Sequence, residues 1–281
     1  MMKTDAKLMQ LFSQLTDYDK YLEENPFHLN LGIDLDDYAQ LDKKIVKGPY
    51  EDVEQENNVP APSELDDLIR LHYLVNSRKV TTILEFGVGK STIVLDQSLE
   101  QNKSKHADFV KQNLRRSNPF ECHSVDNSKK WIEEIKSSYP TTKNVTFHHC
   151  PCEITTFSSR ICTLYQNFPN VCPDLIYLDA PDQFSPTGDV RGITTNHPDR
   201  LPMSADILTF EHFLLPGTLI VVDGRTANAR FLKANLQRHW SYCHSEAYDQ
   251  HFFELKETPL GIYNERQIQF CLGPEWLNDL P

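Results

Sequence analysis

Three acidic residues of this chain, Asp126, Asp179 and Asp223, stand at the ends of short apolar runs. A carboxylate can accept hydrogen bonds from a vicinal diol, hold a hard cation or take a proton. Ligands of open parallel sheets lie at the carboxyl ends of the strands. If the three runs are neighbouring parallel strands, the three carboxylates therefore face one crevice.

A glycine turn follows an earlier apolar run, residues 80–86. Gly87 and Gly89 stand directly after this run, and a helical stretch begins near Ser91. Glycine permits positive φ and a close approach of a ligand to the backbone. The first turn of a helix presents free N–H groups. The segment therefore predicts a strand–turn–helix site for a nucleotide-like ligand.

Two familiar phosphate-binding motifs do not match this turn. The triphosphate loop requires glycine at position 84, which is Leu84. The dinucleotide motif requires a third glycine at position 92, which is Thr92. A NAD-binding oxidoreductase stays open as an alternative, as does a plain strand-to-helix turn without a ligand.

The pattern E-x-G-x-G-x-S, from Glu85 to Ser91, resembles the first motif of class I S-adenosylmethionine-dependent methyltransferases. The resemblance extends over about residues 80–272. Within the family, the chain resembles bacterial small-molecule methyltransferases. The resemblance implies that Gly87, Gly89 and Ser91 bind the cofactor. It also implies that Glu85 lies near the amino group of the cofactor's methionine part.

Two later segments resemble further cofactor-binding positions of the same family. The resemblance implies that Asp126, followed by Asn127, binds the ribose hydroxyls. It places Cys152 and Glu153 against the adenine, in a loop after the third strand. Asp126 comes 41 residues after Glu85, whereas the usual spacing between the glycine turn and the ribose-binding acid is about 20 residues. We expect the polar stretch 101–119 to be an extension that accounts for the excess.

Asp179 and Asp223 follow runs that resemble the fourth and fifth strands of the family. Catechol-type O-methyltransferases hold a divalent metal with an Asp after the fourth strand and an Asp-Asp or Asp-Asn pair after the fifth. Here Gly224 replaces the second member of that pair. The resemblance implies a catalytic pair, Asp179 and Asp223, that binds Mg²⁺, and it places Asp179 against the cofactor, although two carboxylates make a marginal metal site. Candidates for a third oxygen ligand are Asp182 and Asn228.

A long polar insertion, residues 180–203, follows Asp179, and such loops often contact substrate. Its His197 is a candidate catalytic base, because the ordinary pKa of histidine lies near neutrality. An exposed loop histidine without a catalytic role is the alternative. The candidate substrate-binding residues, here and after the fifth strand, are Asp182, Arg191, Arg225 and Arg230.

Alternating apolar runs and helical patterns predict an α/β fold: a Rossmann-like, mostly parallel sheet with helices on both faces and a C-terminal antiparallel hairpin. The predicted strands are Val80–Phe86, Phe120–Val125, Val145–His149, Asp174–Leu178 and Thr218–Val222. The predicted helices are Ser91–Leu99, Ser128–Ser138, Ser204–Phe213 and Ala227–Trp240. Three further strands are predicted over Trp240–Tyr248, Gln250–Leu255 and Gln267–Leu272.

A helical, acidic N-terminal extension, residues 1–60, precedes the predicted methyltransferase-like domain, residues 61–281. Apolar residues at helical spacing predict a helix over Ala6–Tyr21. We expect its apolar stripe to pack on the domain near the crevice, or on a second subunit of a homodimer. Residues 48–62 are expected to form a loop, and Ser63 to cap a second helix that begins near Leu65.

Charge and cysteine content restrict the location and the partners. The net charge is −12, and residues 1–70 hold sixteen acidic against seven basic residues. This balance argues against nucleic-acid and anionic-membrane partners. Seven cysteines without a secretory pattern favour a cytoplasmic protein with reduced thiols.

These features together predict a methyltransferase that transfers a methyl group from S-adenosylmethionine to oxygen on a small molecule, such as a sugar or another metabolite. The main alternative is a methyltransferase-like binding module without turnover, because Gly224 interrupts the metal pattern and no decisive base is present.

Overall fold

The computed structural model describes residues 5, 7–33, 35 and 65–280. Its centre is a seven-stranded sheet in the order β3-β2-β1-β6-β7-β9-β8. The first five of these strands are parallel, and β9 joins β7 in antiparallel orientation. The predicted Rossmann-like sheet with a C-terminal antiparallel hairpin is therefore confirmed.

The strands are β1 (Thr82–Phe86), β2 (Glu121–Asp126), β3 (Val145–His149), β4 (Cys152–Phe157), β5 (Arg160–Tyr165), β6 (Leu175–Leu178), β7 (Leu219–Asp223), β8 (Trp240–Ser245) and β9 (Gln250–Leu255). The α-helices are α1 (Tyr18–Glu24), α2 (Phe27–Asn30), α5 (Leu65–Ser77), α6 (Lys90–Asn113), α7 (Lys129–Ser138), α8 (Asp206–Phe210), α9 (Thr226–Asn235) and α10 (Ile262–Leu272). Three short 3-10 helices are η1 (Leu8–Gln10), η2 (Glu211–Phe213) and η3 (Pro274–Asp279).

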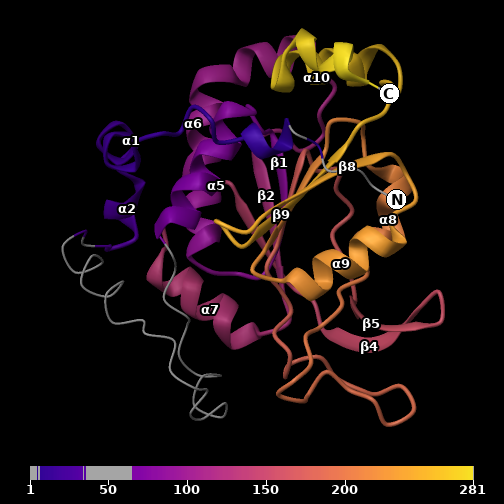
Figure 1. The fold of residues 1–281 in the computed structure, drawn as a ribbon. Helices are drawn as coiled ribbons and strands as arrows, with labels where there is room; N and C mark the ends of the chain where they lie inside the picture. Colours follow the sequence, from indigo (N-terminus) through magenta and orange to yellow (C-terminus); the bar gives the residue numbers. More distant parts are fainter. Residues whose placement is uncertain (1–4, 6, 34, 36–64, 281) are drawn as a thin grey trace.

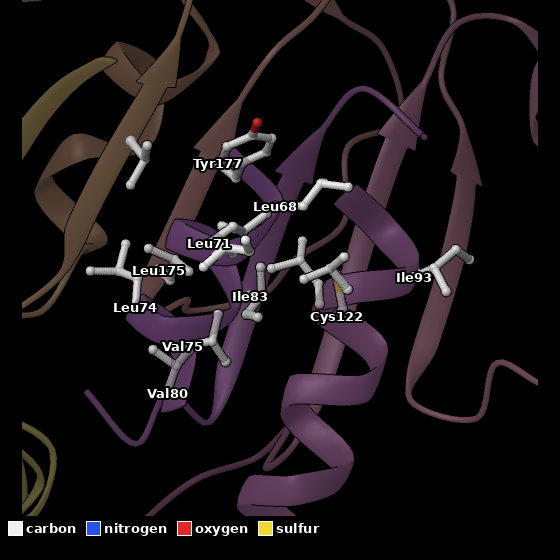
Figure 2. Packing of buried hydrophobic residues seen from close by; sticks show 14 of the residues in the cluster. Leu68, Leu71, Leu74, Val75, Val80, Ile83, Ile93, Cys122, Leu175 and Tyr177 are labelled. Carbon is white, nitrogen blue, oxygen red and sulfur yellow. The ribbon is translucent and has the colours of Figure 1, made fainter. Parts of the chain in front are cut away.

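Alternation along the central strands divides the core into two layers. Ile83 and Leu175 face α5, α6 and α7, whereas Leu84 and Ile176 face α8, α9 and the β4–β5 hairpin. Figure 2 shows the first layer, where leucines of α5 lie over Ile83 and Leu175. Because both faces are covered, the residues of β1 and β6 are buried on both sides of the sheet, as is typical of parallel sheets.

The polar stretch expected between the first two strands continues α6 to Asn113. This 24-residue helix accounts for the long interval between Glu85 and Asp126. The sequence did not predict the separate antiparallel sheet of β4 and β5.

The predicted N-terminal helix over Ala6–Tyr21 is wrong, but apolar side chains of this segment are buried as expected. A single helix over Ala6–Tyr21 is replaced by η1 and α1, because Asp17 caps a new helix by accepting a hydrogen bond from the Lys20 N–H. Phe12 packs edge-on against Tyr248 and Phe252, with ring centroids 5.6 and 5.8 Å apart. The segment thus packs on the sheet-bearing domain, and a homodimer stays a prediction. The expected boundary at residue 60, the loop 48–62 and the Ser63 cap lie outside the described residues.

The predicted strand Gln267–Leu272 is wrong, because these residues belong to helix α10. The short window alternates polar and apolar residues, but over the whole helix Asn264, Ile268 and Cys271 are buried at helical spacing. The Lys79 ammonium donates to the Phe270 carbonyl, which fastens α10 near the start of β1. In Figure 1, α10 (yellow) lies at the opposite end of the sheet from β4 and β5. None of the described helices is long and apolar enough to cross a membrane.

His72 of α5 anchors the N-terminal segment. Its ring stacks on Phe27 with centroids 4.6 Å apart, and its Nδ1 lies 2.8 Å from the Tyr21 hydroxyl. The side chain is buried, so the loss of water around its cation, with a smaller effect of Lys105, lowers the pKa of His72 to about 3.

We expect His72 to make stability depend on pH in acid. Since the folded pKa is depressed, its stabilising contribution is complete above the ordinary pKa of 6.5 and is lost as the pH falls toward about 3. Between pH 6.5 and 4.5 the loss from this residue amounts to about 2 kcal/mol. Denaturant unfolding of His72→Gln at both pH values should show that much less change than wild type. The exposed His212 is the control: His212→Gln should keep the wild-type difference, and equal slopes in all three proteins would contradict the assignment.

Candidate functional site

The glycine turn between β1 and α6 is pressed against the end of β6. Gly87 has φ +102°, and a Cβ at this position would lie 2.9 Å from the Asp179 carbonyl oxygen. Gly89 has an extended φ, and a Cβ there would meet only the Ser91 hydroxyl oxygen, at 3.8 Å. Gly87 is therefore required by the fold, whereas Gly89 leaves open space above the turn.

The buried carboxylate of Glu85, in β1, stabilises this turn. It accepts hydrogen bonds from the hydroxyls of Ser91, Thr92 and Ser124, at 2.6, 2.7 and 2.5 Å. The side chain is fully buried, and burial raises the pKa of Glu85 to about 7 against the lowering effect of these hydroxyls. Because the three hydroxyls already bind the carboxylate, its observed role is to brace the turn. Contact with the cofactor's amino group stays a prediction.

Asp126 joins the end of β2 to the same turn. Its carboxylate accepts hydrogen bonds from the N–H groups of Val88 (3.0 Å) and Ser128 (2.7 Å). The Trp131 indole donates to the Val88 carbonyl, so both the N–H and the carbonyl of Val88 are hydrogen-bonded. Burial raises the pKa of Asp126, and the two N–H groups oppose the rise. The predicted convergence of turn and acid is present. Asn127 follows half-buried, its carbonyl 3.2 Å from the His149 Nε2.

Asp179, at the end of β6, is held by Arg225. The Arg225 Nε donates to the Asp179 Oδ1 at 3.0 Å, and its Nη2 donates to the Asp179 carbonyl at 2.8 Å. Its Nη1 donates to the Pro181 carbonyl at 2.6 Å. The Asp179 side chain is 52% exposed, so its second carboxylate oxygen stays accessible. Arg225, predicted to bind substrate, thus lies at Asp179, whose catalytic role stays a prediction.

Asp223, at the end of β7, is occupied by different partners. The Tyr177 hydroxyl donates to its Oδ2, and the Gln250 amide donates to its Oδ1 at 3.0 Å. Burial, with a contribution from the negative charge of Asp179, raises the pKa of Asp223 to about 6. The same Gln250 amide lies 3.2 Å from Asp67 of α5, so this acid is linked to the helix layer.

The donor set does not fit the implied Mg²⁺ site. Asp179 is paired with Arg225, and both oxygens of Asp223 accept hydrogen bonds from protein groups. Asn228, a candidate third ligand, is buried with its amide bonded to the Ser204 backbone. The other candidate, Asp182, accepts from the N–H groups of its own loop. Among the described residues, no group of three or more His, Cys, Asp or Glu side chains could hold a metal ion.

The remaining predicted substrate residues are spread over the insertion and α9. His197 is exposed, and its Nδ1 accepts from the Asp199 N–H inside the insertion. Arg191 is exposed in a turn with φ +59°. Arg230 is exposed on α9, where its charge acts on Tyr242 and His251 of the terminal hairpin. Their roles as base and substrate-binding residues stay predictions.

The expected adenine loop is corrected in one respect. Cys152 and Glu153 do not lie in a loop but begin strand β4. Cys152 is buried in the core, and its carbonyl accepts from the Thr187 N–H of the insertion. Pairing with β5 explains the strand, since Cys152 lies opposite Tyr165. Their contact with adenine stays a prediction.

Sequence reasoning missed three residues that shape the site. Tyr177 and Gln250 hold Asp223, and the ring centroid of Tyr165 of β5 lies 5.9 Å from that of Phe86, the residue before the glycine turn. The Tyr165 hydroxyl is buried and has no hydrogen-bond partner among the described residues. The sequence analysis predicted no strand over residues 160–165, so nothing local connected Tyr165 with the crevice.

No protein-family model matches the chain, and no curated protein matches it. Solved structures similar to it include a methyltransferase of Podospora anserina with bound S-adenosylhomocysteine, at 12% identity and a TM-score of 0.43, over 80% of this chain and 97% of that one. An O-methyltransferase of Streptomyces achromogenes in complex with S-adenosylmethionine is 13% identical, with a TM-score of 0.39, over 77% of this chain and 94% of that one. An N-methyltransferase of Bradyrhizobium japonicum with S-adenosylhomocysteine is 14% identical, with a TM-score of 0.35, over 78% of this chain and 98% of that one. Because every TM-score is below 0.5, the function proposed below rests on the residues of the site.

We expect Gly87→Ala to destabilise the protein through two effects. Positive φ alone costs about 1–2 kcal/mol for a residue with a Cβ, and the Cβ would also press on the Asp179 carbonyl. Gly32 is the control, because it has φ +64° and a Cβ added there would meet no atom within 4 Å. In denaturant unfolding, Gly87→Ala should lose about 3 kcal/mol and Gly32→Ala about 1 kcal/mol. Equal losses would show that the contact with β6 is unimportant.

Proposed function

We propose that this protein transfers a methyl group from S-adenosylmethionine to an oxygen atom of a small molecule. One observation carries the proposal: the Asp126 carboxylate is bonded to the Val88 N–H, inside the glycine turn. This bond makes the end of β2 and the turn after β1 one continuous cradle. The sequence resemblance to class I methyltransferases involves the same two positions.

The cradle fits the chemistry of the cofactor. Asp126 accepts hydrogen bonds from the N–H groups of Val88 and Ser128, with a smaller backbone contribution from Asn127, and the remaining lone pairs of its carboxylate can accept from a ribose diol. The first N–H groups of α6 and the positive end of its dipole favour the methionine carboxylate. The open space at Gly89 admits the ligand to the backbone.

The same cradle argues against a dinucleotide. Thr92 stands where that motif needs its third glycine, and its hydroxyl accepts from the Gly89 N–H and donates to Glu85. The Gly89 N–H is thus already bonded to Thr92 and is not free to bind the pyrophosphate of a dinucleotide.

Asp179 supplies the catalytic side of the proposal. When bound, the cofactor supplies an electrophilic methyl group on a sulfonium. Asp179 is held by Arg225 through one carboxylate oxygen and presents the other to the crevice, where it takes the proton of the acceptor hydroxyl. With the cofactor bound, the acceptor oxygen would displace the cofactor's sulfur from the methyl carbon, so the main task of the residues of the site is alignment.

The thiols support the proposed location in the cytoplasm. All seven cysteines are free, and six of them are buried. Free thiols persist where the compartment is reducing.

We expect S-adenosylhomocysteine to stabilise the protein and Gly89→Val to remove that effect selectively. At 100 times its dissociation constant, a ligand that binds only the folded state adds about 2.7 kcal/mol to the free energy of unfolding. Gly89→Val should unfold like wild type without ligand, because valine adopts an extended φ and open space surrounds its Cβ. With ligand, its melting temperature should stay unchanged, because the side chain fills the cradle.

Thermal unfolding and calorimetric titration check this expectation, with NAD and ATP as comparison ligands. Stabilisation by NAD or ATP without stabilisation by S-adenosylhomocysteine would refute the proposed function. If Gly89→Val binds S-adenosylhomocysteine as wild type does, the cofactor does not approach the backbone at this turn.

A further inference from the structure

We propose that the Arg225 guanidinium takes the place of a divalent cation in the acceptor half of the site, so that this chain orients Asp179 with a built-in cation. The inference rests on the proposed methyl transfer and extends it to the acceptor. The sequence resembles a metal-binding pattern at Asp179 and Asp223, but in the structure Asp179 is bonded to Arg225.

The bonds of Arg225 go to the types of oxygen that a hard cation takes. One carboxylate oxygen and two backbone carbonyl oxygens, from Asp179 and Pro181, accept its three hydrogen bonds at 2.6 to 3.0 Å. Carboxylates and carbonyls are also the usual protein ligands of Mg²⁺ and Ca²⁺. The guanidinium is planar and always charged, and it presents five N–H donors in a rigid fork. Two donors therefore remain for an acceptor molecule.

The backbone fixes the guanidinium at this place. Gly224 adopts φ +57°, and its N–H donates to the Asp249 carbonyl. The Arg225 carbonyl accepts from the Ala229 N–H, in the first turn of α9. The arginine side chain is only 20% exposed. Gly224 stands where the metal pattern has its second acid, and this glycine turn brings Arg225 to β6.

The second carboxylate, that of Asp223, is bonded to groups other than this pair. Tyr177 and Gln250 donate to the two oxygens of Asp223, and Gln250 is shared with Asp67. A cation that bridged Asp179 and Asp223 would have to compete with the charge of Arg225 and break these bonds of Asp223.

A built-in cation changes what the acceptor must offer. A metal-dependent site favours acceptors with two neighbouring oxygens that chelate the ion. A guanidinium whose charge is balanced by Asp179 needs only one hydroxyl that can accept an N–H and pass its proton to the carboxylate. We therefore assign an uncharged alcohol, without a chelating pair of oxygens, as the acceptor class.

The test uses Mn²⁺ as the probe, on the full chain saturated with S-adenosylhomocysteine. Electron paramagnetic resonance measures free Mn²⁺, and calorimetry measures binding. Wild type should leave the free Mn²⁺ signal unchanged. Arg225→Gln, which removes the charge and keeps much of the side-chain volume, should bind one equivalent, and adding Asp179→Asn should abolish that binding. Arg225→Lys, which keeps a cation, should exclude Mn²⁺ as wild type does.

Arg266→Gln on α10, an exposed residue at the opposite end of the sheet, is the control for the change in net charge and should bind no Mn²⁺. Binding of Mn²⁺ by wild type that Asp179→Asn abolishes would overturn the inference, as would Arg225→Gln that binds none. The S-adenosylhomocysteine affinity of wild type, measured in the same samples, tests the proposed function separately.

Discussion

The close approach of the Gly87 backbone to the end of β6 is the constraint on which the site depends. A Cβ would lie 2.9 Å from the Asp179 carbonyl oxygen, so only glycine lets the two strand ends meet. The turn that follows points the Val88 N–H at Asp126, and the same Asp179 carbonyl accepts from Arg225. One backbone contact therefore aligns the proposed cofactor cradle with Asp179, the acid that we propose faces the acceptor.

Much of this arrangement could be predicted from the sequence, because it depends on local patterns. Apolar runs placed the five parallel strands to within about two residues. The glycines of the turn and the acids at the strand ends followed from the chemistry of each residue type. The carboxyl ends of parallel strands share one edge, so the convergence of Asp126 and Asp179 needed no further information.

The parts that could not be predicted depend on contacts between distant segments. Nothing near Asp223 indicates that Gln250 and Tyr177 bind its carboxylate. The sequence placed Arg225 and Arg230 after the fifth strand, but nothing in it decides which of the two binds Asp179. The same limit explains α10, whose buried positions become clear only when the end of the sheet that it covers is known. The mistaken helix over Ala6–Tyr21 shows the converse: its apolar residues are buried as expected, although Asp17 divides the backbone.

The contact between Arg225 and Asp179 also determines how the site responds to its surroundings. An ion taken from solution occupies its place according to its concentration and dissociation constant, so its occupancy falls when other molecules compete for it. A guanidinium on the same chain has no dissociation constant and cannot be removed by competition. The positive charge beside Asp179 is therefore present in every folded molecule, whatever the supply of divalent ions.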